Sequence, residues 1–307
     1  MGRAPRLPEE RSLFGFLALY GIITKIGPGE YDLTVNDILD QILPTVTKPG
    51  RYTGGEWNSI AKDWGSSEVR WALAFPDTYE IGMSNLGLAI LYDLLNREEG
   101  VLAERVYAPW VDMEAAMRAA GLPLFSLESR HPLSQFDVIG FSLPYEQSYT
   151  GLLNMLDLAR LPVLASARDG GHPLVIAGGG AAFNPEPMAD FVDAFVLGDG
   201  EEVVVDITCA IREAQRQQSS RKELLRTLAG IWGVYVPSVY KVDYQDDGTV
   251  ARIEPNVPGL QMPVRKRIVT TLPPPLTRPL VPFLDTVHNR AVVEIQRGCT
   301  RGCRFCH

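Results

Sequence analysis

Three of the four cysteines in this 307-residue chain lie within its last nine residues. Cys299, Cys303 and Cys306 are spaced C-x3-C-x2-C, and Phe305 directly precedes the last of them. Three thiolates on one tight loop can ligate three irons of a [4Fe–4S] cluster, which leaves the fourth iron without a protein ligand. An open iron can chelate a small molecule, as a catalytic zinc ion does through its free coordination position. The spacing therefore favours an iron–sulfur site with room for a small ligand.

Two other kinds of site share part of this pattern. Residues 303–307 read C-x-x-C-H, the attachment motif of c-type haem, but such a site would require export and leaves Cys299 without a role. A structural zinc site could use the three cysteines and His307. However, adjacent Cys306 and His307 are poorly placed for one tetrahedron, because zinc ligands usually come in spaced pairs. We therefore favour the iron–sulfur site over both alternatives.

The cysteine loop follows "AVVEI" (291–295), an apolar run typical of a buried strand. In this context the chain resembles the radical S-adenosylmethionine (SAM) enzymes, whose signature is C-x3-C-x-aromatic-C after the first strand of a barrel. The resemblance implies that Cys299, Cys303 and Cys306 ligate the cluster and that Phe305 lies near the adenine of SAM. In that family the reduced cluster donates an electron to SAM, and a 5′-deoxyadenosyl radical then abstracts a hydrogen atom. An electron donor such as flavodoxin or ferredoxin is implied as a partner.

Upstream, residues 67–217 alternate between apolar runs and helical patterns, which predicts a parallel sheet with right-handed crossovers. Asn85 or Ser84 is an expected helix N-cap, and Gly121 an expected helix end. The fold class predicted is α/β, a doubly wound, five-stranded parallel sheet of flavodoxin-like type. Strands are expected at 69–75, 104–110, 136–143, 173–180 and 192–200, and helices at 84–96, 111–120, 147–160 and 201–217.

A domain of this kind before a radical SAM motif resembles the B12-binding radical SAM proteins, from about Lys48 to His307. The segments "FPDTYEIGMSNLGL" and "IAGGGAAFNPEPMADFVDAFVLGDGEE" look like a bacterial subgroup of that family without an assigned substrate. Many cobalamin domains carry D-x-H-x-x-G after the first strand, and its histidine ligates cobalt. Here Asp77 and Gly82 keep the spacing, but Tyr79 occupies the histidine position. We therefore expect any bound cobalamin to lack a histidine ligand.

Two interpretations of the glycine-rich strand ends remain open. In the first, glycines let the backbone approach a large flat ligand, and Ser142 hydrogen-bonds a corrin amide. In the second, the glycines only make tight turns, and the pocket is empty or serves another purpose. The candidate cofactor-binding residues are Asp77, Tyr79, Gly82, Ser142, Gly178, Gly179, Gly180, Gly198, Gly200 and Phe305; the metal ligands are Cys299, Cys303 and Cys306. No pair of carboxylates indicates acid–base catalysis, so the catalytic residues are unknown.

The other polar residues suggest structural roles. Cys209 is expected to be a small buried hydrophobe within a helix. His131 and His172 are expected in exposed polar loops, and Glu56 with Trp57 is expected to pack an N-terminal arm on the domain. The net charge of −8 gives no electrostatic footprint for nucleic acid, so RNA is conceivable only as a substrate. No apolar run reaches the ~20 residues of a membrane span, and "LFGFLALYGII" (13–23) resembles a signal peptide only faintly.

The domains expected are an N-terminal extension (1–40), an N-terminal arm (41–66), a cobalamin-binding-like domain (67–217), a connector with a Pro-rich linker (218–288) and the start of a radical SAM domain (289–307). We expect a cytoplasmic enzyme, truncated after the first barrel strand, that cleaves SAM reductively and acts on an unknown substrate, with methyl transfer or RNA modification as examples. As a truncated chain it should hold a cluster poorly. The alternative is a cobalamin- or metal-binding module without catalysis.

Overall fold

The computed structural model describes residues 34–260 and 262–304, and within them the chain has an α/β architecture. A sheet of six strands in these residues has the order β2-β1-β3-β4-β5-β6; the first five are parallel, and β6 is antiparallel to β5. Its strands are β1 Val69–Phe75, β2 Val101–Tyr107, β3 Val138–Ser142, β4 Leu174–Gly178, β5 Ala194–Val196 and β6 Val234–Tyr235. The order 2-1-3-4-5 is a common doubly wound order. The five parallel strands are therefore as predicted, except that β2 lies at 101–107 and not at 104–110. β6 adds a short antiparallel edge strand.

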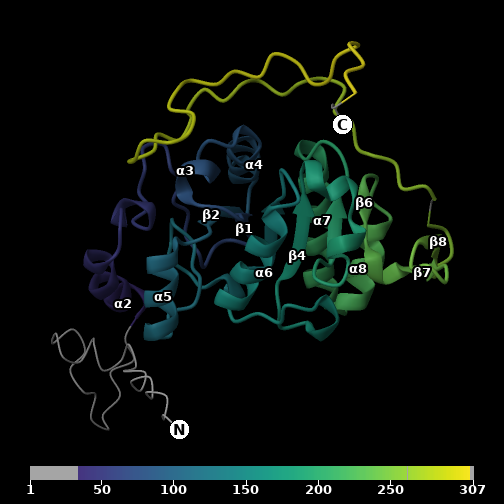
Figure 1. Ribbon diagram of the computed structural model, residues 1–307, viewed down its shortest axis with the longest axis horizontal. Coiled ribbons are helices and arrows are strands. Elements are labelled where there is room, and N and C mark those ends of the chain that lie inside the picture. The colour runs from purple at the N-terminus through teal and green to yellow at the C-terminus, as the bar shows by residue number, and fades with distance from the viewer. Residues whose placement is uncertain (1–33, 261, 305–307) are drawn as a thin grey trace, which may run out of the picture.

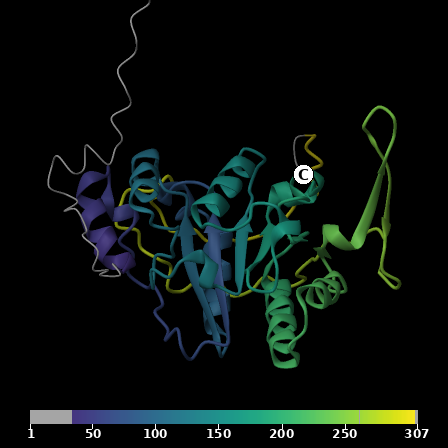
Figure 2. The ribbon, with the colours of Figure 1, turned by 90° about the horizontal axis from the view of Figure 1, so that it is seen from below.

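Helices cover both faces of the sheet (Figures 1 and 2). The chain runs from β1 to the edge strand β2, and then from β3 through β4 to β5 in the opposite direction. Right-handed crossovers in opposite directions place the connecting helices on opposite faces of the sheet. α4 and α7 pack together over β1, and an ion pair between Arg118 and Asp157 at 2.7 Å joins α5 to α6 on the other face. The α-helices of the described residues are α2 Val35–Ile42, α3 Tyr79–Gly82, α4 Leu86–Arg97, α5 Val111–Ala120, α6 Ser148–Leu158, α7 Glu201–Gln217 and α8 Arg221–Ala229.

Single residues set one end of each of two helices, as the sequence predicts. Asn85 is the N-cap of α4, where its Oδ1 accepts a hydrogen bond from the Leu88 N–H at 2.8 Å. Gly121 ends α5 in the left-handed conformation, with φ 64°. Since α4 begins just beyond β1, its cap holds Asn85 at the carboxyl edge of the sheet.

The prediction for Cys209 is wrong, because its side chain is exposed. α7 buries Val203, Val204, Ile207 and Ile211. This spacing of three to four residues forms one apolar stripe against the sheet, and Cys209 lies outside it.

The N-terminal arm is fastened by a buried ion pair. Glu56 is 2% exposed, and its Oε2 lies 2.6 Å from Nη2 of Arg105 on β2. Trp57, in contrast, is 76% exposed. Glu56 therefore packs the arm on the domain as expected, whereas the Trp57 side chain does not.

Beyond α8 the chain leaves the sheet and forms a separate hairpin. Strands β7 Tyr240–Tyr244 and β8 Val250–Pro255 pair antiparallel around the turn predicted at 246–248. The hairpin projects to one side of the sheet (Figure 2). Short 3-10 turns link the larger elements: Leu43–Thr45, Pro49–Arg51, Leu133–Gln135, Ala165–Ala167, Gly180–Phe183, Glu186–Met188 and Pro237–Val239.

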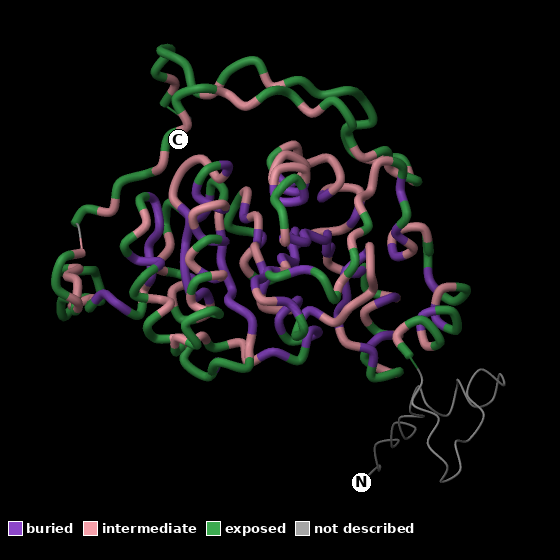
Figure 3. Tube along the Cα trace, turned by 180° about the vertical axis from the view of Figure 1, so that it is seen from behind, coloured by how far each residue is buried: buried purple, intermediate pink, exposed green. Residues whose placement is uncertain are grey.

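The C-terminal strap, which we define as residues 262–304, crosses the carboxyl ends of the strands and then turns back (Figure 1). It is largely exposed, in contrast to the buried sheet beneath it (Figure 3). The Arg267 N–H donates to the Leu197 carbonyl at 2.7 Å, beside the end of β5. Farther along, the Phe283 N–H donates to the Tyr79 hydroxyl at 3.2 Å. The strap is thus attached to both halves of the sheet.

The buried strand expected at 291–295 does not form in this structure. Val292, Val293 and Ile295 are 47%, 65% and 83% exposed. A strand needs neighbours that pair its backbone groups and cover its apolar side chains, and no described residue pairs with this segment. Among the described residues, no helix has both the length and the hydrophobicity required to cross a membrane. The apolar segment at 13–23 lies outside the described residues.

Candidate functional site

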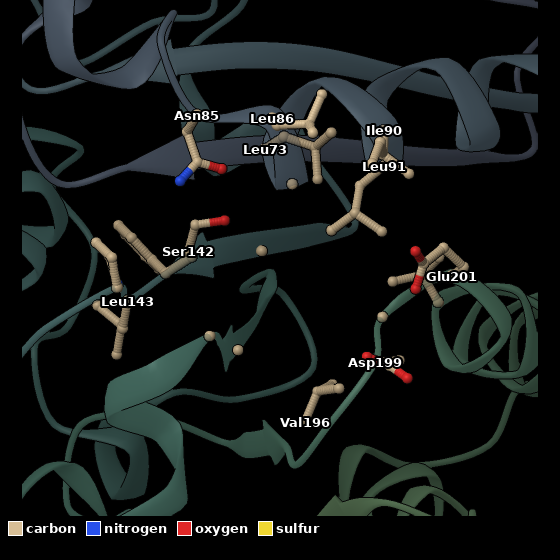
Figure 4. A pocket seen from close by; sticks show the side chains of 18 of the residues that line it. Leu73, Asn85, Leu86, Ile90, Leu91, Ser142, Leu143, Val196, Asp199 and Glu201 are labelled. Atoms are coloured by element: carbon tan, nitrogen blue, oxygen red, sulfur yellow. The ribbon is translucent and has the colours of Figure 1, made fainter. Parts of the chain in front are cut away.

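A cavity of about 520 Å³ lies at the carboxyl ends of β1, β3, β4 and β5, between the sheet and helices α4 and α7 (Figure 4). Doubly wound sheets bind ligands at this edge, and the volume is typical of small-molecule sites. Its lining is mostly apolar side chains and glycines: Trp71, Leu73, Leu86, Ile90, Leu91, Gly140, Leu143, Ile176, Gly178, Val196 and Val204. The site therefore suits a ligand with a substantial apolar part.

Two uncharged polar side chains face this cavity. Ser142 ends β3, and its hydroxyl is directed into the open space (Figure 4). Asn85 lies across the cavity, with its amide nitrogen at the edge of the same space (Figure 4). A hydroxyl and an amide can bind the polar groups of an uncharged ligand, so the cavity combines apolar walls with a few orienting groups.

Four charged side chains line the mouth of the cavity. Arg297, from the strap, has Nη1 3.2 Å from Asp199 Oδ1 and also pairs with Glu201 at the start of α7. Its Nε and Nη2 donate to the two oxygens of Glu294, at 2.7 and 2.9 Å. Hydrogen bonds to Glu294 and Glu201 raise the pKa of Arg297, and the hydrogen bond from Arg297 lowers the pKa of Glu294. Arg297 is therefore a cation held by three carboxylates.

A second cavity of about 350 Å³ lies beneath the strap and adjoins the first. Asn85 and Leu86 line both cavities. Met83 and Arg105 lie on its domain side, and His288 is among the strap residues that close it. The two cavities are therefore neighbours on either side of Asn85 and Leu86.

In the D-x-Y-x-x-G motif, Gly82 lines the second cavity, whereas Asp77 and Tyr79 line neither cavity. Tyr79 is 1% exposed, its hydroxyl accepts the Phe283 N–H, and burial raises its pKa. Asp77 accepts a hydrogen bond from the next residue's N–H at 2.7 Å. A Cβ at Gly82 would lie 2.3 Å from the Tyr107 ring, so close packing requires glycine there. Contact of these three residues with a cofactor stays a prediction.

The glycines after β4 differ in their surroundings. Gly178 lines the cavity, and a Cβ there would meet only Val196, at 3.6 Å. Gly179 has φ 105°, and a Cβ there would lie 2.6 Å from the Leu143 carbonyl oxygen. Gly180, also in the lining, begins a 3-10 turn. Gly179 also lines the cavity but is required by the turn, whereas Gly178 leaves room for a ligand.

The glycines after β5 pack closely against other parts of the chain. Gly198 has φ 103°, and a Cβ there would lie 2.0 Å from the Arg267 carbonyl oxygen of the strap. A Cβ at Gly200 would lie 3.2 Å from the Leu91 side chain of α4. Both residues line the cavity, so a ligand contact is also compatible with their positions.

The cysteine motif is only partly described. Cys299 is exposed and Cys303 is half-buried, whereas Phe305 and Cys306 lie outside the described residues. Within the described part of the chain, no three His, Cys, Asp or Glu side chains form a group able to hold a metal ion. The three-cysteine site therefore stays a prediction.

The two histidines expected in exposed loops are half-buried. His131 stacks on Trp64, with ring centroids 3.7 Å apart, and burial lowers its pKa. Nδ1 of His172 lies 2.8 Å from Asp169 Oδ1. Neither residue lines the two cavities described above.

The sequence interpretation overlooked Arg297, Asp199 and Glu294 as site residues. A usable signal was present, because Arg297 directly precedes Gly298 and Cys299 and lies three residues after an acidic side chain. What the pattern did not indicate is the distant partner, 98 residues upstream at the end of β5 (297 − 199).

A known family model matches a large part of the sheet domain. Residues 87–237 match the family model described as "Radical SAM proteins, N-terminal". The chain is similar to a radical SAM N-terminal region. The match covers the chain from the start of α4 through the edge strand β6, and so includes most of the cavity lining. It supports a radical SAM protein. A search of curated proteins found no match.

Proposed function

We propose that the protein is a radical SAM enzyme in which Cys299, Cys303 and Cys306 hold a [4Fe–4S] cluster. The observation that carries the proposal is the position of Arg297, which binds Asp199 and Glu201 at the cavity mouth. Because Arg297 is two residues before Cys299, the cysteine loop begins beside the cavity. The C-x3-C-x2-C spacing and the family match support the same assignment.

The donor set fits an iron–sulfur cluster. Three thiolates in one loop can serve three irons, and an open iron supplies a site for SAM and an electron for its reductive cleavage. Gly298 and Gly302 have φ 66° and 69°, and each directly precedes a cysteine. These left-handed glycines turn the backbone sharply, which places Cys299 and Cys303 on one loop.

We further propose that the sheet domain is of the flavodoxin-like, cobalamin-binding type. The first cavity fits part of such a cofactor, because its walls are apolar and Gly178 leaves open space beside the sheet. The adjoining cavity beneath the strap extends the available volume. Bound cobalamin would supply a carrier for a methyl group. Ser142 and Asn85 would orient its amide groups, and no histidine ligand to cobalt is expected because Tyr79 occupies the histidine position of the motif.

The cluster is tested by anaerobic reconstitution of the protein, as its gene encodes it, with iron and sulfide. About four irons per protein and the electron paramagnetic resonance (EPR) signal of a reduced [4Fe–4S] cluster are expected. Cys299→Ala, Cys303→Ala and Cys306→Ala should each lower the iron content, whereas Cys209→Ala should not, because Cys209 lies apart on α7. Full iron loading in the three variants would contradict the assignment.

Cobalamin binding is tested with hydroxocobalamin and Gly178→Leu. The larger side chain should fill the cavity and weaken binding at least about tenfold, since the site is preformed. Gly170→Ala is the control, because a Cβ at Gly170 meets nothing within 4 Å. Equal affinity in the Gly178 variant would contradict this site, and no binding to the unaltered protein would contradict the cobalamin proposal. The spectrum of the complex should show no imidazole ligand.

A further inference from the structure

The cysteine loop contains two Arg-Gly-Cys triplets, at 297–299 and 301–303, and their arginines differ in environment. The Arg297 side chain is 25% exposed and contacts three carboxylates. Arg301 is exposed and forms no ion pair with any described residue. Arg297 and Arg301 share the same following residues, but only Arg297 is held by carboxylates. The difference in their environments therefore comes from the partners of Arg297 and not from the local sequence.

Those partners belong to the part of the sheet that forms the cavity. Asp199 follows β5, and its Oδ2 also accepts the Val269 N–H at 2.8 Å. Asp199 thus contacts both limbs of the strap, Val269 on the outward limb and Arg297 on the returning one. Glu201 begins α7, and its side chain is only 8% exposed. A guanidinium presents several donors in one plane and can satisfy several carboxylate oxygens at once.

Glu294 lies on the strap itself and restrains the Arg297 side chain. It binds Nε and Nη2 of Arg297 from three residues upstream. This local pair limits the orientations of the guanidinium that contacts Asp199 and Glu201. The conformational entropy of a long side chain opposes ion pairing. The restraint by Glu294 lowers this cost and so favours one docked position of Arg297.

We propose that Asp199 and Glu201 dock Arg297 and thereby hold the cysteine loop at the mouth of the cavity, which makes Arg297 a positioning residue for the cluster. The role towards the cluster rests on the proposed function, whereas the docking of the loop does not. The potential of an iron–sulfur cluster depends on nearby charge, hydrogen bonds and solvent exposure. Loss of the docked arginine should therefore change the cluster as well as the loop.

Docking is tested by trypsin on the full chain without iron, with thiols kept reduced. Trypsin must take the arginine side chain into its own pocket, so docking protects the Arg297–Gly298 bond. The Arg301–Gly302 bond has the same flanking residues, glycine and cysteine, on its C-terminal side and serves as the internal reference. At early time points, mass spectrometry should show cleavage after Arg297 about tenfold slower than after Arg301, as expected for a site open only part of the time.

The double variant Asp199→Asn/Glu201→Gln should bring the two cleavage rates to within about twofold, because the remaining pair with Glu294 is local and partly exposed. Glu213→Gln, on the same helix as Glu201, is the matched control and should keep the difference. Equal rates in the unaltered protein, or a tenfold difference that persists in the double variant, would overturn the docking proposal.

The positioning role is tested on the reconstituted protein. Arg297→Ala should shift the EPR spectrum and the midpoint potential of the cluster, and Arg297→Lys should restore them in part, since lysine keeps the charge without the planar fork. Arg301→Ala should change neither. An unchanged spectrum and potential in Arg297→Ala would overturn the positioning role. Failure of the unaltered protein to take up a cluster would contradict the proposed function, and the trypsin comparison would still decide the docking.

Discussion

Arg105 is a fully buried cation between two carboxylates. Its Nη2 lies 2.6 Å from Glu56 and its Nε 2.6 Å from Glu128, and the arginine side chain has no exposed surface. The arm, β2 and the loop after α5 meet at this one side chain. Arg105 also lines the cavity beneath the strap, so the residue connects the stability of the domain with the shape of the site.

Replacing this arginine should be costly. Arg105→Met leaves two buried carboxylates without a cation, and the free energy of unfolding at pH 7 should fall by about 3–5 kcal/mol. Arg97→Met is the matched control, because Arg97 pairs with Asp93 one helical turn away on the surface and should lose less than about 1 kcal/mol. Urea unfolding measures both variants. A loss in Arg105→Met no larger than that in Arg97→Met would show that the buried network adds no more stability than a surface ion pair.

Gly198 joins the strap to the end of β5. A side chain at φ 103° is strained, and the added Cβ would lie 2.0 Å from the Arg267 carbonyl oxygen. Gly198→Ala should therefore reduce the free energy of unfolding by about 1–3 kcal/mol and speed proteolysis within the strap. Gly170→Ala, which adds a methyl group in open space, should have little effect. Unchanged stability and proteolysis in Gly198→Ala would mean that the strap does not depend on this contact.

At the scale of elements, the sequence patterns were sufficient for most of the sheet domain. The cap at Asn85 and the helix end at Gly121 are local signals, and the five parallel strands are apolar runs between helices. The strap was not predictable in this way, because its anchors are pairs such as Arg267 with Leu197 that are distant in sequence and depend on the finished sheet. The strand expected at 291–295 fails for a related reason, and Ile295 is exposed. An apolar run forms a strand only where neighbouring strands can pair with it.

The arm and α3 are joined by Glu80, which should make this contact depend on pH. Burial opposes ionisation, but hydrogen bonds from Arg51 and Lys48 prevail and lower the pKa of Glu80 below its ordinary value of 4.5. A lowered folded-state pKa gives stability that is present above the unfolded pKa and lost as the pH falls through the folded pKa.

Glu80→Gln should therefore destabilise the protein by about 1–2 kcal/mol at pH 7, and the difference from the unaltered protein should shrink towards pH 3. Urea unfolding at the two pH values measures it. Glu213→Gln, an exposed carboxylate on α7, controls for loss of a charge alone. A difference that stays constant between pH 7 and pH 3 would contradict the assigned pKa shift.

For the whole molecule, the strap brings the cysteine loop back to the sheet. It leaves the hairpin side, crosses the carboxyl edge and returns so that Arg297 meets Asp199 at the cavity (Figure 1). The first cavity and the start of the cysteine loop are thus adjacent although they are distant in sequence. The proposed function requires such proximity, because the reacting groups of a radical enzyme must meet in one shielded space.

The formation of 5′-deoxyadenosine tests this account most directly. The protein, as its gene encodes it, is reconstituted anaerobically and given SAM and a strong reductant. We predict that 5′-deoxyadenosine forms, that Cys299→Ala, Cys303→Ala and Cys306→Ala each abolish it, and that Cys209→Ala does not. If the cluster-loaded, unaltered protein yields no 5′-deoxyadenosine, or if the three cysteine variants still yield it, the radical SAM assignment is contradicted.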